Sequence, residues 1–469
     1  MPAACITAAG ARCPNLRAVP EPRPPRRGGF PPAILGVPLV GLLAANLPLV
    51  AAGVTVLVGT AVLAIVSPGA FIAVAAVLST AFPKAGYVLS GFPIPVMMPV
   101  LLVAALLLRW RADPAARHGV RLAVVALAWL AYRLVSLRLD GGALGDALAL
   151  AGWYGLPIVL LLIGPPLGSV RGREGSVWRT RLETGLLFAC GFSLVQQVFG
   201  LEQTVVPGIT RAVGSDYAAK PLLFPGGTKI PSTYQNGNIL GVITGFFFLV
   251  AAERVLRGRG RPRDGLVMAA TAVATVLSGS RTVIIGLAIG VAVLVFRSGL
   301  NRRTIAVFVL GAAVLATVLL LSPALADRLI GTKASDPALA QRTAGWSNIV
   351  ATTSVTELLT GGPVWAQHLL DPGQAEGLIG AVQQVGIIGV SLFIGVFLMM
   401  TNPPALRRWR LVLIPVAVSF LVDSAYLVFP TLFLPIARMF SPLRPDVETE
   451  PEAPDDQAEA VEVPSPVRL

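Results

Sequence analysis

Charged residues are scarce in this sequence: Asp, Glu, Lys and Arg together make up only 13% of its 469 residues. With 55% hydrophobic residues and a mean hydropathy of +0.75, this scarcity excludes an ordinary soluble domain. The short alternating strands of a membrane β-barrel are also lacking. We therefore expect an all-α fold, a polytopic transmembrane helical bundle of about 12 to 14 spans.

Cysteine and histidine are rare as well, with three and two copies. Cys5 and Cys13 lie near the N-terminus and Cys190 lies in an apolar segment, so neither a disulfide framework nor a cysteine-based metal site is predicted. We predict no metal and no cofactor.

The predicted spans are apolar runs bounded by charged residues or by Pro and Gly. They cover residues 33–49, 50–66, 68–82, 93–109, 119–138, 145–164, 182–199, 237–256, 265–279, 281–297, 304–322 and 378–400, with one or two more between 411 and 440.

The net charge of +13 reflects membrane topology rather than nucleic-acid binding, because most Arg residues stand in short runs between apolar segments. These runs are Arg109 to Arg121, Arg171 to Arg181, Arg254 to Arg263, Arg297 to Arg303 and Arg407 to Arg410. All fall on one side of the predicted bundle. By the positive-inside rule that side is the cytoplasm, and both termini are predicted to lie there too, in a multi-pass protein of the cytoplasmic membrane.

The chain divides into three parts by composition. Residues 1–32 are rich in Pro and Arg and are predicted to form a disordered cytoplasmic arm. Residues 33–440 form the transmembrane domain, with two long outer loops at 200–236 and 323–377. Residues 441–469 are acidic and rich in Pro, which predicts a disordered cytoplasmic tail.

Basic residues on the outer side run against the topology rule. Arg211, Lys220 and Lys229 fall in the first outer loop, and Arg281 falls in a short turn between two spans. In one interpretation these cations only reach lipid headgroups or water. In the other they converge on an anionic group, since guanidinium and ammonium groups bind phosphate oxygens. Hydroxyls of Ser278, Ser280 and Thr282 would then add donors.

The stretch before the span at 237–256 predicts a helix start. Asn236-Gly237 is a turn signal and Asn238 is a suitable N-cap residue. A helix N-terminus at the membrane face is also an anion site, because its free N–H groups and its dipole favour negative charge.

Three sequence blocks carry a family resemblance. The first block is Lys229 with Ser232-Thr-Tyr-Gln-Asn-Gly-Asn-Ile-Leu-Gly241, and the second is Leu277-Ser-Gly-Ser-Arg-Thr282. The third block comprises Arg342, Trp346, Gly361-Gly362 and Glu376-Gly-Leu-Ile-Gly-Ala-Val-Gln-Gln-Val-Gly-Ile-Ile-Gly389. In order and placement, over roughly residues 180 to 400, these blocks resemble the O-antigen ligase and polymerase family.

That resemblance implies transfer of a glycan from a polyprenyl diphosphate to a lipid, protein or glycan acceptor, at the outer face of the membrane, in envelope polysaccharide assembly. Arg281 would contact the diphosphate, beside Lys229 and Arg211, and stabilise its charge as it leaves, without a metal. The ligases carry a His where this sequence reads Ala375-Glu376. The resemblance therefore points to Glu376 or His368 as the general base, and toward a polymerase or another relative rather than a strict ligase.

Other functions stay open at this point. One is a transporter or flippase of a lipid-linked or amphipathic substrate. Secondary transporters usually keep ionisable residues in their spans, and the sequence offers few: Asp423, with Asp146 and Glu183 near span ends. This disfavours a proton-coupled mechanism but does not exclude a flippase. A metal-dependent glycosyltransferase with an acidic first outer loop is disfavoured, because residues 47–53 contain no acid. A structural subunit of an envelope-synthesis complex is a further alternative.

Overall fold

The computed structural model describes residues 48–89, 92–110, 120–164, 173–210, 212–213, 229–234, 236–258, 260–299, 301–321, 347, 351, 353–362, 377–400 and 413–422. The predicted arm at 1–32 and the predicted tail at 441–469 lie outside the described residues, as does nearly all of the first predicted span, 33–49.

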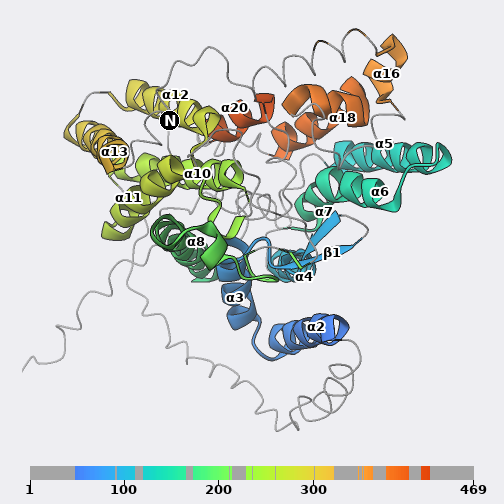
Figure 1. The fold of residues 1–469 in the computed structure, drawn as a ribbon, viewed down its shortest axis with the longest axis horizontal. Coiled ribbons are helices and arrows are strands. Elements are labelled where there is room, and N and C mark those ends of the chain that lie inside the picture. The colour runs from blue at the N-terminus through green and yellow to red at the C-terminus, as the bar shows by residue number, and fades with distance from the viewer. Residues whose placement is uncertain are drawn as a thin grey trace, which may run out of the picture.

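The described residues are mostly helical and form one bundle (Figure 1). The α-helices are α2 Pro48–Val66, α3 Pro68–Ala81, α4 Met97–Trp110, α5 Val120–Leu139, α6 Leu144–Leu150, α7 Leu156–Ile163, α8 Arg173–Phe199, α9 Leu201–Thr204, α10 Gly237–Leu256, α11 Pro262–Leu277, α12 Arg281–Ser298, α13 Arg302–Leu321, α16 Val355–Thr360, α18 Gly377–Met400 and α20 Ile414–Val422. A π-helical turn, η1 (Ala151–Gly155), joins α6 to α7, and a 3-10 turn, η2 (Ser232–Tyr234), precedes α10.

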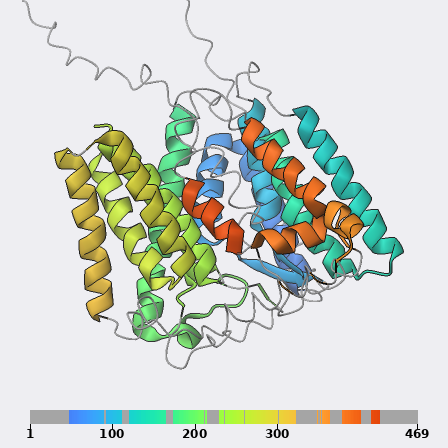
Figure 2. The ribbon, with the colours of Figure 1, turned by 90° about the horizontal axis from the view of Figure 1, so that it is seen from above.

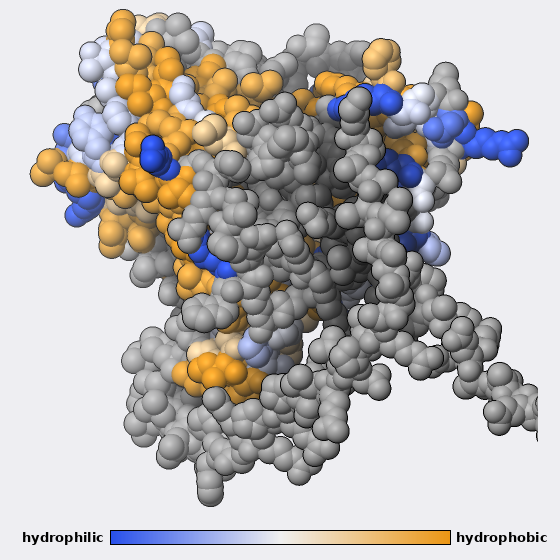
Figure 3. Space-filling view, turned by 180° about the vertical axis from the view of Figure 1, so that it is seen from behind, coloured by the Kyte–Doolittle hydropathy of each residue, from blue (hydrophilic) through white to orange (hydrophobic). Residues whose placement is uncertain are grey.

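Six stretches of helix within the described ranges are long and apolar enough to cross a membrane. They are Val120–Leu139, Leu144–Ile163, Val177–Phe199, Gly237–Leu256, Arg281–Ser298 and Gly377–Met399. Large apolar side chains also lie on the outside of the bundle, among them Phe296 and Leu320, and Figure 3 shows such residues over much of the coloured surface. The prediction of a polytopic membrane protein is confirmed at this level, whereas 12 to 14 spans stays a prediction.

A β-hairpin replaces the beginning of one predicted span. Strands β1 (Gly86–Leu89) and β2 (Phe92–Pro95) pair antiparallel, and helix α4 begins only at Met97 rather than at residue 93. The prediction of an unbroken span at 93–109 is wrong because Pro93 and Pro95 lack the N–H groups that a helix interior needs, while an edge strand tolerates them. The all-α prediction holds for the bundle but did not include this hairpin.

The hairpin is joined to the first outer loop. On the other edge of β1, Val88 N–H donates to the carbonyl of Val213 at 2.9 Å, and Val213 N–H donates to that of Gly86 at 2.8 Å. The Gly86 N–H donates in turn to the Gly208 carbonyl at 3.2 Å. Gly208 and Val213 of the first outer loop therefore add backbone hydrogen bonds to the free edge of β1.

Helix α10 forms the centre of one half of the bundle and is almost entirely buried. It packs against α11, α12 and α20. Small residues permit this close packing: a Cβ atom on Gly290 of α12 would lie 2.4 Å from Leu249, and one on Gly245 would lie 3.3 Å from Val283. The hydroxyls of Thr244 and Thr275 lie 2.7 Å apart between α10 and α11.

Charged side chains join α8, α10 and α11 at the end of the bundle where α10 finishes. Arg254 of α10 lies 2.7 Å from Asp264 of α11 and 3.4 Å from Glu183 of α8, and Arg263 lies 3.1 Å from Glu183. Arg179 lies 3.8 Å from the same carboxylate. Arg179 of one basic run and Arg254 and Arg263 of another therefore meet at one end of the bundle, as predicted. The assignment of that end to the cytoplasm stays a prediction.

Candidate functional site

Two asparagines of the first block shape the start of α10. The Asn236 side chain accepts a hydrogen bond from the backbone N–H of Asn238 at 2.8 Å, which makes Asn236 the N-cap of the helix. The prediction that Asn238 is the cap is wrong, because Asn236 already occupies the extended cap position. Asn238 instead accepts a hydrogen bond from Lys229, with Nζ and Oδ1 2.5 Å apart. Lys229 is thereby held at the first turn of α10.

The η2 turn before α10 is tied to α8 and α3. Ser232 has a φ of 54°, the one positive value for a non-glycine residue in the described ranges. Its N–H donates to Gln196 Oε1 at 2.7 Å, its carbonyl accepts from Gln196 Nε2 at 3.1 Å, and its hydroxyl donates to the Ala189 carbonyl at 2.6 Å. The Tyr234 hydroxyl donates to the Thr80 carbonyl at 2.6 Å, and burial raises its pKa well above the usual value. The turn is therefore fixed from both sides.

Gln196 was not among the predicted site residues. The sequence does show a glutamine near the end of an apolar run, which could have indicated it. A buried carboxamide needs hydrogen-bond partners for both its oxygen and its nitrogen. In α8 these partners are the backbone groups of Ser232.

The second block forms the tight turn between α11 and α12. Gly279 takes a φ of 59°, and the N–H of Ser280 donates to Ser278 Oγ at 3.3 Å. Ser278 Oγ in turn donates to the Thr275 carbonyl at 2.6 Å, and Ser278 is fully buried. The prediction that Ser278 adds a hydroxyl donor for an anion is therefore wrong, because its proton is used within the turn. Ser280 is the N-cap of α12, which begins at the half-buried Arg281.

The first and second blocks lie against each other. The N–H of Ile230 donates to the Leu277 carbonyl at 3.2 Å. A Cβ on Gly237 would lie 2.6 Å from the Ser278 carbonyl oxygen and 2.8 Å from Lys229 Cβ. The glycine between the two asparagines is thus required because the turn of the second block approaches the backbone of the first.

This contact places two helix starts at one end of the bundle. Helices α10 and α12 both begin there and pack against each other. A cation lies at each start: Lys229, which precedes α10, binds Asn238 in its first turn, and Arg281 is the first residue of α12. Helix N-termini have unsatisfied N–H groups and a partial positive charge. The arrangement suits an anion with several oxygens, such as a diphosphate.

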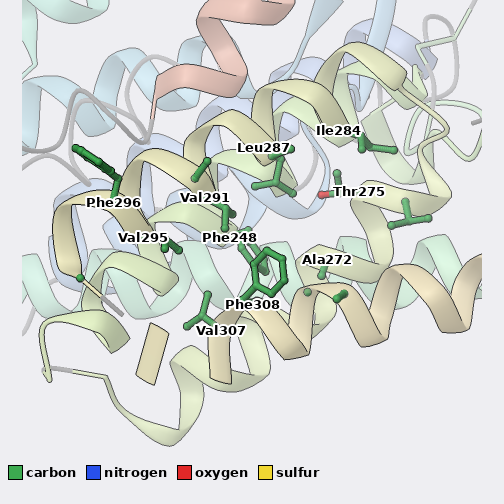
Figure 4. A pocket seen from close by; sticks show the side chains of 16 residues that line it. Phe248, Ala272, Thr275, Ile284, Leu287, Val291, Val295, Phe296, Val307 and Phe308 are labelled. Carbon is green, nitrogen blue, oxygen red and sulfur yellow. The ribbon is translucent and has the colours of Figure 1, made fainter. Parts of the chain in front are cut away.

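An apolar cavity of about 700 Å³ lies between α10, α11, α12 and α13 (Figure 4). Its lining includes Phe248, Thr275, Ile284, Leu287, Val291 and Phe308. Ile284 stands one turn after Arg281, while Gly299, just past the end of α12, lines the opposite part. The cavity therefore follows nearly the whole of α12, starting one turn from a site cation, and its lining suits a hydrocarbon chain.

The described part of the third block surrounds a break in α18. Gly386 has a φ of 73° inside this helix, and Figure 2 shows two segments of α18 that meet at an angle beside α16. The Gly362 N–H donates to the Gln383 carbonyl at 3.0 Å, so the two parts of the block contact each other. Helix α20 packs against α18 on one side and against α10 and α12 on the other, and it connects the third block to the first two.

The remaining predicted site residues, Arg211, His368 and Glu376, lie outside the described residues, as do Arg342 and Trp346. Their roles stay predictions. Within the described ranges, no group of three or more His, Cys, Asp and Glu side chains is arranged to hold a metal ion.

No protein-family model, no curated protein and no solved structure matches the chain. The resemblance to O-antigen ligases and polymerases therefore stays a prediction that rests on the three blocks.

Proposed function

We propose that this protein transfers or polymerises a glycan from a polyprenyl-diphosphate-linked donor, at the outer face of the cytoplasmic membrane, during assembly of envelope polysaccharide. The observation that carries the proposal is the contact between the first and second blocks, which gathers two helix starts and two cations at one end of the bundle.

In this proposal the diphosphate of the donor binds at the starts of α10 and α12. Arg281 presents a planar guanidinium to phosphate oxygens, and Lys229, fixed by its bond to Asn238, adds a second positive charge. Arg211 is proposed to assist them. Charge builds up on the diphosphate as the bond to the sugar breaks, so groups already aimed at it lower the barrier of that step.

The lipid part of the donor is proposed to occupy the cavity along α12. A polyprenyl chain is a long hydrocarbon, and its burial among apolar side chains is favourable in proportion to the area covered. Because the cavity begins one turn from Arg281, the polyprenyl chain would bind directly next to the diphosphate.

The acceptor hydroxyl needs a base, for which we propose Glu376, with His368 as the alternative. Carboxylate and imidazole side chains are common general bases in enzymes. The third block, which includes Glu376, would thus serve the acceptor, while the first two blocks serve the donor.

The test is glycan transfer from a purified polyprenyl-diphosphate donor by the reconstituted full-length protein. Arg281→Ala should lower the rate by roughly 100-fold, because one lost electrostatic donor in an active site costs about that much. Arg297→Ala is the matched control, since Arg297 is exposed at the opposite end of the same helix. Transfer by Arg281→Ala at the rate of the control would refute the role of Arg281.

The base is tested in the same assay. Glu376→Gln keeps the shape of the side chain and should abolish transfer, while His368→Ala should not. If Glu376→Gln is active and His368→Ala is inactive, the base is His368. The length distribution of the product then separates polymerisation from single transfer.

A further inference from the structure

Arg133 is a fully charged side chain buried in one of the helices that can cross a membrane. The residue lies in α5, and only 2% of its surface is exposed. A guanidinium in such a position must be satisfied by protein groups, since neither lipid nor water is available to it. Its Nε donates to the Gln384 carbonyl at 3.3 Å and its Nη2 to the Gly362 carbonyl at 3.2 Å. Both acceptors belong to the third block.

These carbonyls can accept because α18 is broken. In an unbroken helix each carbonyl accepts from the residue four positions later, and the conformation of Gly386 interrupts that series. Three successive carbonyls before the break accept from other parts of the chain. The pairs are Gly362 N–H to Gln383, Arg133 Nε to Gln384, and Trp129 Nε1 to Val385, at 3.0, 3.3 and 2.9 Å.

The side chain of Gln384 is held as well. Its Oε1 accepts a hydrogen bond from the Tyr154 hydroxyl at 2.8 Å. Tyr154 is buried and lies on the π-helical turn η1, where the wider turn changes the direction of side chains relative to a regular helix. Side chains from two elements, α5 and η1, therefore form hydrogen bonds with Gln384 of α18.

Glycines make room for this contact. A Cβ on Gly361 would lie 2.8 Å from the Gln384 carbonyl oxygen and 3.0 Å from Arg133 Nε. A Cβ on Gly386 would lie 2.2 Å from the Leu359 carbonyl oxygen at the end of α16. The end of α16 is thus inserted at the break, with Arg133 directly beside it.

We propose that Arg133, together with Trp129, is a positioning residue of the third block. It fixes the angle between the two segments of α18 and joins residues 361–362 to them, so that the acceptor side of the site is held at a constant distance from the donor side. Its effect on catalysis rests on the function proposed above, whereas its effect on the break does not. Lysine is a poor substitute, because a single ammonium lacks the rigid fork that reaches two carbonyls.

The structural arm of the test is amide hydrogen exchange of the full-length protein in nanodiscs. Arg133→Gln should speed exchange in residues 377–389 about tenfold and leave α10 and α12 unchanged, with Arg133→Lys in between. Arg121→Gln, an exposed arginine at the other end of α5, is the control and should behave as wild type. Unchanged exchange at 377–389 in Arg133→Gln would overturn the proposal.

If Arg133→Gln unfolds the whole bundle, Trp129→Phe decides the matter. It removes one donor, to the Val385 carbonyl, and keeps an aromatic ring in place. Faster exchange limited to 377–389 supports the proposal, and wild-type exchange overturns it.

The catalytic arm separates positioning from donor binding. Arg133→Lys should lower kcat by roughly tenfold, as a small misplacement of reacting groups does, and leave KM for the donor within about twofold of wild type. A raised donor KM with unchanged kcat would show donor binding by Arg133 and overturn its positioning role. If wild-type protein performs no transfer, the proposed function fails, while the exchange experiment still decides whether Arg133 holds the break.

Discussion

Arg254 and Arg133 are both guanidinium groups in helices that are long and apolar enough to cross a membrane, yet they have different partners. Arg254 in α10 meets carboxylates, at 2.7 Å from Asp264 and 3.4 Å from Glu183. Arg133 in α5 meets main-chain carbonyls that the break in α18 leaves available. Arg254 is therefore stabilised by the negative charges of carboxylates, whereas Arg133 is stabilised by the dipoles of carbonyl groups.

The two solutions place different demands on the backbone. A carboxylate is carried by a side chain, so α8, α10 and α11 can remain regular helices while their charges pair. Arg133 is instead bound by carbonyls that lie beside an interruption of α18, so the α5–α18 region depends on glycines with positive φ, Gly361 and Gly386. We therefore expect the second region to be sensitive to glycine substitution and the first to loss of a carboxylate.

The largest effect should come from Gly386→Ala. The new methyl group would meet the Leu359 carbonyl oxygen, a main-chain atom, and the left-handed φ would be strained; together we expect a loss of about 4 kcal/mol in the free energy of unfolding. Gly191→Ala in α8, where nothing lies within 4 Å of the added Cβ, is the control. Thermal unfolding in detergent measures both. Equal melting temperatures would mean that the break does not depend on glycine.

A smaller effect is expected for Glu183→Gln in the other region. The substitution leaves Arg254, Arg263 and Arg179 without their shared carboxylate, and breaking a buried ion pair in this way costs about 3 kcal/mol. Glu202→Gln changes an exposed carboxylate in α9 and serves as the control. If both variants unfold at the wild-type temperature, carboxylate pairing does not hold the three helices together.

The smallest effect concerns Lys84, a buried cation in the turn between α3 and β1. Burial lowers the pKa of its ammonium from 10.5 to about 7. Because the unfolded chain keeps its proton to a higher pH, stability should rise with pH through this window, by about 1 kcal/mol between pH 7 and 8. Lys84→Met should flatten that rise in thermal unfolding measured at several pH values. Release of the proton from a buried lysine is thus a third way to bury a basic side chain. An equal pH dependence of stability in wild type and Lys84→Met would contradict it.

Hydropathy predicted the positions of most helices within a few residues, because long apolar runs have few alternatives in a membrane. The span predicted at 237–256 matches α10 in full. What hydropathy could not predict was where apolar segments change conformation. The π-helical turn at 151–155 and the break at Gly386 both lie inside predicted spans, and strand β2 of the hairpin lies at the beginning of one.

The candidate site was predicted in part. The order of the blocks indicated that Lys229 and Arg281 belong together, and the contact between Gly237 and Ser278 agrees with that. Gln196 and Arg133 were missed, because each contacts a residue far away in the sequence, and no local pattern shows which carbonyl or amide will be its partner. For Gln196 and Arg133 alike, the sequence shows only a single polar residue within an apolar run, which indicates a buried polar group but not its partner.

Helix α20 is the last described element to be synthesised, yet it covers the interior of the bundle. Pro415 packs against both α10 and α12: a Cβ on Gly286 would lie 2.8 Å from its Cα, and one on Gly245 would lie 3.6 Å from its Cβ. Helices α10 and α12 are therefore synthesised long before α20 can cover their inner faces. The contact of α20 with α10 and α12 can form only after residue 422 has been synthesised, so it is a late event in the biosynthesis of the chain.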